Sequence, residues 1–271
     1  MMAGSLGRIG ALMLRHWYLL RSSWPRLLDM IYWPTVQMLT WGFITLSMAS
    51  PSGAAGMGAA GMGAGVLLAA AMLWDVLLRA QLGTTMSFLE EMYARNLGHL
   101  LASPLRPVEM LVALALVGLL RTLIGMVPTS LLAIWFFGFS VYDMGLALVG
   151  FFAALVIMGW AIALFISGLV MRVGMGAEAL AWGFVFALAP LSAVFYPVSV
   201  LPEFLQGVAF ALPSAHVFEG MRHLLATGVV DLGDLVTAFA LDTVYLALGI
   251  FAFLRFHKSA RNKGRLLQTG E

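Results

Sequence analysis

The sequence predicts an all-α protein that crosses a membrane several times, with both chain ends in the cytoplasm. Of its 271 residues, 62% are hydrophobic and 10% are charged, and the mean hydropathy is +0.96. A soluble domain carries about 25% charged residues because its surface must meet water. Six apolar stretches approach or exceed the roughly 20 residues that a spanning helix needs. Lys and Arg gather in the segments that would lie on one side of the membrane.

The six apolar stretches are expected to form the transmembrane helices. Pro34 falls inside the first and is expected to kink it. The third is longer than the hydrocarbon core, so it must tilt, bend near Pro128 or protrude. A run of Gly and Ala at 53–65, where the second begins, would let helices approach closely. The expected spans are 27–49, 58–80, 107–137, 145–171, 177–197 and 233–255.

The segment before the first span is amphipathic and holds too many arginines to cross a membrane. Arg8, Arg15 and Ser22 recur every seven residues, so they share one face of a helix. Apolar residues cover much of the remaining surface. We therefore expect residues 5–24 to form an amphipathic helix that lies in the membrane interface.

The segment between the fifth and sixth spans, residues 201–228, contains an apolar stretch that is too short to cross. Pro202 and Pro213 are each expected to start a helix, and Ser214 is expected to cap the second one. We expect two short helices that dip into one leaflet and return, forming an external re-entrant pair.

The basic residues orient the predicted helices, because cytoplasmic loops retain Lys and Arg. Thirteen of the 15 lie in the N-terminal arm, around the loop after the second span, at Arg172 and from Arg255 into the C-terminal tail at 256–271. On the opposite side there is Arg222, and Arg121 falls inside a span. This distribution predicts six spans with cytoplasmic termini.

The loop after the second span, residues 84–103, is expected to form an amphipathic cytoplasmic helix. Ser87 and Glu90 have the spacing of a capping box. Glu91 and Arg95 stand four residues apart and are expected to pair. Such a helix either docks into a groove on a partner protein or rests on the lipid surface, and the pattern alone leaves both alternatives open.

Two charged residues fall at a similar depth near the middle of the membrane. They are Arg121 in the third span and Asp242 in the sixth. Because isolated charges there are costly, we expect Arg121 to pair with Asp242 or to face a transported substrate. The alternative is that Arg121 extends to the interface along its aliphatic stem. Asp75 and Arg79, four residues apart, are expected to form a local ion pair.

Several classes of site are excluded or disfavoured by the composition. The chain has no cysteine, so thiolate metal sites and cysteine nucleophiles are impossible. No phosphate-binding loop motif occurs, so the chain is not expected to bind ATP through such a loop of its own. The net charge of +2 is too small to indicate a nucleic-acid partner. His216, Glu219, Arg222 and His223 cluster in the external segment, where we expect a polar rim at the outer mouth in preference to a metal site.

Two segments resemble the permease subunits of ABC-2 type (type V) ATP-binding-cassette exporters, which include polysaccharide, lipo-oligosaccharide and drug exporters. The first is FLEEMYARNLGHLLASPLRP at 88–107, which is similar to the family's cytoplasmic coupling helix. The second is FYPVSVLPEFLQGVAFALPSAHVFEGMRHLL at 195–225, which is similar to its external re-entrant pair.

The resemblance implies roles for residues in both segments. The contacts to the ATPase subunit would be Phe88, Glu90, Glu91, Arg95 and Leu100. The outer gate would be shaped by Phe195, Tyr196, Pro197, Pro202, Pro213, His216 and Arg222.

The resemblance further implies a permease in a bacterial inner membrane that has no catalytic site or cofactor of its own. Its partners would be a second permease copy, membrane lipids and separate ATPase subunits that bind ATP and magnesium. The expected activity is ATP-driven export of an amphipathic, lipid-linked or drug-like substrate. The alternatives are a secondary carrier or channel, which would need paired broken helices or repeat symmetry, and a membrane-embedded enzyme. An enzyme would need a concentrated set of His, Asp or Glu near one leaflet, and the loops are too poor in these residues.

Overall fold

The computed structural model describes residues 2–49, 65–174, 176 and 179–262, and within these ranges the secondary structure is helical. The 3-10 turns η3 (Val141–Met144) and η5 (Val198–Val200) lie between α5 and α6 and between α7 and α8. The helices are α1 (Met2–Arg21), α2 (Trp24–Ala49), α3 (Gly65–Tyr93), α4 (Leu97–Ala102), α5 (Pro107–Phe137), α6 (Leu146–Val173), α7 (Ala179–Leu191), α8 (Glu203–Phe210), α9 (Pro213–Thr227) and α10 (Leu232–Asn262).

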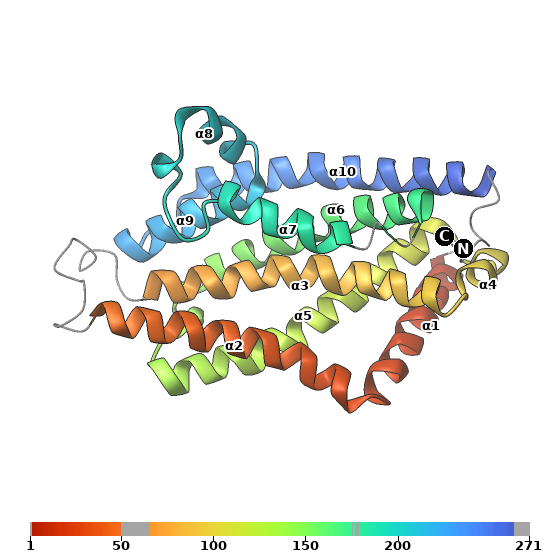
Figure 1. Ribbon diagram of the computed structural model, residues 1–271, viewed down its shortest axis with the longest axis horizontal. Helices are drawn as coiled ribbons and strands as arrows, with labels where there is room; N and C mark the ends of the chain where they lie inside the picture. The colour runs from red at the N-terminus through yellow and green to blue at the C-terminus, as the bar shows by residue number, and fades with distance from the viewer. Residues whose placement is uncertain (1, 50–64, 175, 177–178, 263–271) are drawn as a thin grey trace.

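The long helices lie side by side in the order α10, α6, α3, α5 and α2, and α1 crosses the end of α5 (Figure 1). In the most apolar part of α3, 78% of the residues are buried, compared with 17% in α10. Helix α3 is therefore the centre of the bundle and α10 lies at its edge. We call the end with α1 and α4 the α1 end, and the end with α8 and α9 the α9 end (Figure 1).

Among the described residues, four helices are long and apolar enough to cross a membrane: α3, α5, α6 and α10. The chain is thus a polytopic α-helical membrane protein. Helix α2 has the length but carries Arg26, Asp29 and Gln37 among its residues. Helix α7 has 13 residues and ends at Leu191, although the sequence predicts a span over 177–197. The chain bends after α7, where Ala193 has a φ of 49°.

The region expected to form a separate helix over 84–103 is divided between two helices. Residues 84–93 continue α3 without a break, and Ser87 donates a hydrogen bond to the Gly83 carbonyl inside it. Helix α3 ends where Arg95 adopts a φ of 55° and the Asn96 amide donates to the Glu91 carbonyl. This left-handed turn is the Schellman arrangement, in which glycine is the usual residue. The remainder of the region forms the short helix α4.

Prolines and glycines set the ends of the other long helices. Helix α5 has the bounds expected from the sequence because Pro107 starts it and Gly138, with a φ of 63°, ends it. Helix α9 likewise starts at Pro213, but its N-cap is Leu212. Ser214 therefore does not act as the cap, and its hydroxyl instead lies 2.7 Å from that of Ser192.

Close approaches between helices occur at single glycines. A Cβ added at Gly249 of α10 would lie 2.6 Å from the Ala161 carbonyl oxygen of α6. A Cβ at Gly118 of α5 would lie 3.1 Å from the Thr84 amide nitrogen of α3. These glycines allow backbone contact between neighbouring helices. The Gly and Ala run at 53–65 lies outside the described residues apart from Gly65.

Candidate functional site

Two consecutive carboxylates at the end of α3 are the centre of an ion-pair network. Glu91 is buried, and its carboxylate forms an ion pair with Arg15 Nη1 at 2.8 Å and lies 3.3 Å from His16 Nε2. Both partners are on α1, and His16 is fully buried. The network therefore attaches the amphipathic helix α1 to the central helix of the bundle. The i,i+4 pair expected between Glu91 and Arg95 is replaced by this longer-range pair.

Glu90, the neighbouring carboxylate, joins three further helices. Arg121 Nη2 of α5 donates to it at 2.8 Å, while Arg26 of α2 and His16 of α1 lie 3.8 Å away. Arg121 is therefore paired with α3 and not with Asp242, as the sequence had led us to expect. The long aliphatic stem of Arg121 carries its guanidinium toward the α1 end of the bundle, where Glu90 lies.

A second tie attaches α1 to the start of α5. Arg8 Nε donates to Glu109 Oε2 at 2.7 Å, and the Ser5 hydroxyl donates to Oε1 at the same distance. The hydrogen bond with Glu109 raises the pKa of Arg8 above its ordinary value. The Glu109 carboxylate also accepts from the Arg106 amide as part of a capping box. One carboxylate thus starts α5 and holds α1 in place.

The residues predicted to contact an ATPase subunit face different ways. Phe88 is buried and packs edge-on against Phe253 of α10, with ring centroids 6.0 Å apart. Together with Glu91 it points into the molecule, whereas Glu90 is partly exposed. Arg95 is exposed, and Leu100 of α4 is partly buried. The accessible part of the predicted contact is therefore the turn at Arg95 and helix α4.

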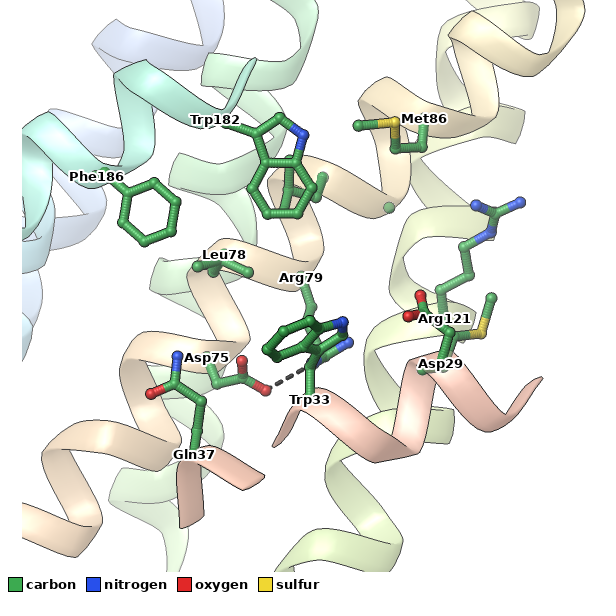
Figure 2. A pocket seen from close by; sticks show the side chains of 13 residues that line it. Asp29, Trp33, Gln37, Asp75, Leu78, Arg79, Met86, Arg121, Trp182 and Phe186 are labelled. Carbon is green, nitrogen blue, oxygen red and sulfur yellow. Dashed lines mark hydrogen bonds and ion pairs between the residues drawn. The ribbon is translucent and has the colours of Figure 1, made fainter. Parts of the chain in front are cut away.

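A cavity of about 490 Å³ lies between α2, α3, α5 and α7 (Figure 2). On α3, Asp75 and Arg79 form the predicted local ion pair, with Oδ2 and Nε 2.6 Å apart. Aromatic side chains and further charges complete the lining. The lining residues are Asp29, Met30, Trp33, Gln37, Asp75, Leu78, Arg79, Leu82, Gly83, Met86, Arg121, Trp182 and Phe186.

The lining of this cavity has both apolar and charged parts. Figure 2 shows Trp182 and Phe186 of α7 on one side of α3, and Trp33 of α2 on another. Arg121 reaches the cavity while its guanidinium bonds to Glu90. Aromatic faces next to fixed charges are suited to a molecule that has an apolar body and a polar group.

These helices and this geometry can be compared with known proteins. The sequence profile described as ABC-2 type transporter matches residues 9–226. The chain belongs to the ABC-2 type transporter family. Members of this family are permease components that normally work with a nucleotide-binding ATPase partner. A comparison with curated proteins gives no match.

At the α9 end of this ABC-2 permease, Arg222 holds the bend that follows α7. Its Nη1 donates to the carbonyls of Ala193 at 3.0 Å and Val194 at 3.3 Å, and its Nη2 lies 3.1 Å from Glu219. Glu219 in turn accepts from the Val198 amide at 2.6 Å. A buried arginine thus holds two carbonyls of the backbone segment that connects α7 to η5.

Other residues predicted for the outer gate join neighbouring segments of the permease. His216 contacts Asp234 of α10 and the Phe210 carbonyl, each at 3.0 Å. Phe195 stacks on Trp41 of α2 at 4.0 Å, and the Tyr196 hydroxyl donates to the Pro190 carbonyl. Pro197, Pro202 and Pro213 each stand at the start of a helical segment: η5, α8 and α9. Within the described ranges, no group of three or more His, Asp or Glu side chains could hold a metal ion.

Asp242 of the permease is buried, with 1% of its surface exposed. Among the described residues neither of its carboxylate oxygens has a hydrogen-bond partner. Arg121 and Asp242 therefore do not form the expected pair.

The sequence did not predict that residues of α1 and α2 would pair with Glu90 and Glu91. The seven-residue spacing of Arg8 and Arg15 was the available signal, because both arginines bind acidic residues at one end of the bundle.

Proposed function

We propose that this chain is the permease subunit of an ATP-driven exporter, in which α4 receives force from a separate ATPase subunit. The observation that carries the proposal is the ion-pair network of Glu90 and Glu91. It ties α1, α2 and α5 to the last turn of α3, immediately before the exposed turn at Arg95 and helix α4. A displacement of α4 would therefore reach four helices together.

The proposed topology has six transmembrane segments with the α1 end in the cytoplasm. The excess of Lys and Arg at that end supports this orientation. Helix α2, with 26 residues, is about 39 Å long and can cross the hydrocarbon core. Helix α7, with 13 residues, is about 20 Å long and cannot cross alone. In our proposal the bend after α7 and the α8–α9 pair complete that crossing at the outer surface.

The cavity between α2, α3, α5 and α7 is the proposed substrate site. Its mixture of aromatic and charged side chains supports an amphipathic, lipid-linked or drug-like substrate. Trp33 and Phe186 are each 56% exposed, which supports a second permease copy that closes the cavity from the open side. Export would follow when ATP hydrolysis in the partner subunits moves the tied helices α1, α2, α3 and α5 relative to α7.

The test is a crosslink between α4 and a P-loop ATPase coexpressed from a neighbouring gene. Because the chain has no cysteine, a single cysteine at His99 can carry a crosslinker, and Phe204→Cys on α8 is the control from the opposite end. We expect crosslinking from position 99 alone, together with ATP-dependent export in vesicles. Export without any ATPase, or an equal yield from Phe204→Cys, would contradict the proposal.

A secondary carrier is the second candidate, because Asp242 is a buried carboxylate without a partner among the described residues. Carboxylates in such positions take part in proton relays of transporters. The carrier hypothesis requires uptake or export driven by a proton gradient in vesicles that lack the ATPase. It also requires that Asp242→Asn abolish this transport while an ATP-driven exporter would retain its activity.

A further inference from the structure

The charged side chains that line the cavity between α2, α3, α5 and α7 differ in whether they already have a partner. Asp75 and Arg79 pair with each other at 2.6 Å, and Arg121 donates to Glu90 at 2.8 Å. Within the described part of the chain, the side chain of Asp29 forms no ion pair, and in Figure 2 the dashed line joins Asp75 and Arg79 without reaching it. The Asp29 carboxylate is therefore available to a bound molecule.

Asp29 presents this charge to the open space of the cavity. It lines the cavity and is exposed. The basic residue one turn before it, Arg26, does not line the cavity, and its Nη1 lies 3.8 Å from Glu90 Oε1. The arginines near Asp29 are thus directed to another acid, at the end of α3.

Aromatic rings face the same space as this carboxylate. Asp29, Trp33 and Gln37 follow one another at four-residue intervals on α2, so they share one face of that helix. Trp182 and Phe186 reach the cavity from α7 (Figure 2), with their rings stacked at an interplanar angle of 17°. The face of an aromatic ring is its negative part. The rings and the carboxylate therefore favour the same sign of charge in a bound molecule.

We propose that this cavity selects an amphipathic organic cation, whose positive group pairs with Asp29 and whose apolar body lies against Trp33 and the rings of α7. A cation is attracted both by the carboxylate and by the ring faces. An anion would gain neither contact, since Arg79 and Arg121 already hold carboxylates. The inference rests on the proposed function, in which this cavity is the substrate site, and it names the class of substrate.

The test uses two lipophilic ions of the same shape and opposite charge, tetraphenylphosphonium and tetraphenylborate. Saturable binding of each ion to the purified full-length protein is measured by equilibrium dialysis, without nucleotide. A contact with a charged group changes affinity about tenfold and the ring faces add about fivefold, so we expect the cation to bind about 50-fold more tightly than the anion.

Substitutions at position 29 separate charge from packing. Asp29→Asn keeps the shape of the side chain and should reduce the preference for the cation about tenfold. Asp29→Glu should retain the preference, and Asp29→Lys should make the anion the tighter ligand. Asp143→Asn is the matched control, because it makes the same change at an exposed carboxylate of η3 outside the cavity. It should bind both ions as the wild-type protein does.

Three results would overturn the inference: equal binding of the two ions by the wild-type protein, an unchanged preference in Asp29→Asn, or an equal loss of preference in Asp143→Asn. Failure of the proposed function is observed separately, as the absence of ATP-dependent export, because the dialysis requires no nucleotide. Conversely, ATP-dependent export of tetraphenylborate at the same rate as tetraphenylphosphonium would contradict the class of substrate and leave the ATP-driven exporter standing.

Discussion

Arg121 of α5 donates a hydrogen bond to Glu90 of α3 at 2.8 Å, although the two residues are 31 positions apart in the sequence. The arginine side chain is 9% exposed and that of Glu90 is 26% exposed. This ion pair fixes the register between two of the helices that line the proposed substrate cavity. It also lies directly before the turn that leads to α4, where we propose that force from the ATPase enters.

Loss of this pair should damage both stability and transport. A hydrogen bond to a charged group contributes about 1.5–3 kcal/mol, so Arg121→Leu is expected to lower the unfolding temperature and to reduce export. Arg21→Leu is the matched control, since that arginine is exposed at the end of α1. Thermal unfolding and vesicle transport measure the two effects. Wild-type stability and export in Arg121→Leu would contradict the importance of the pair.

Neutralising Glu91 should loosen α1 without unfolding the bundle. Glu91→Gln removes the carboxylate charge that lies 2.8 Å from Arg15 and 3.3 Å from the buried His16, both on α1. A spin label at Gly10→Cys, where no neighbouring atom would meet a side chain, should become more mobile. Glu203→Gln, at the start of α8, is the control. Unchanged label mobility in Glu91→Gln would show that α1 is held by its other contacts.

The substrate cavity can be tested with two tryptophans of the same helix. Trp33 lines the cavity, while Trp24 is exposed at the start of α2 and does not line it. Loss of an aromatic contact worth about 1.4 kcal/mol changes affinity about tenfold. Trp33→Ala should therefore raise about tenfold the concentration of an amphipathic substrate that half-stimulates ATPase activity. If Trp24→Ala has the same effect, the cavity is not the binding site.

Packing of α10 on α6 should depend on the absence of a side chain at position 249. In Gly249→Ala the new methyl would start 2.6 Å from the Ala161 carbonyl oxygen, so the two helices must separate. Overpacking of this kind costs about 1–3 kcal/mol. Gly10→Ala, which meets no neighbouring atom, should leave thermal unfolding unchanged. Equal unfolding temperatures for the two variants would contradict the close helix contact.

The sequence predicted elements well where local residues determine them. Helix α5 has the expected bounds because Pro107 and Gly138 act within one turn of its ends. Asp75 and Arg79 pair as expected because they are neighbours on one helix. The family, too, was identified correctly, since the resemblance rested on two contiguous segments, both of which lie within the matched range 9–226.

The network was not predictable because its members lie far apart in the sequence. Thr84, Ser87 and Glu91 look like loop residues, yet all three are buried in α3. The hydroxyls of Thr84 and Ser87 bond to carbonyls of the preceding turn, and Glu91 is neutralised by α1. The expected pairing of Arg121 with Asp242 was also wrong, because the long arginine side chain reaches Glu90 of α3 instead.

The tie between Arg8 and Glu109 has a consequence for how the protein is made. The two residues are separated by 101 positions, so Glu109 leaves the ribosome long after Arg8. Helix α1 is synthesised before α3 and α5, but it cannot take its final place until α3 has been inserted and α5 has begun to enter the membrane. During biogenesis its arginines must therefore be accommodated by water or lipid headgroups, and a helix that is made before its partners is fastened after them.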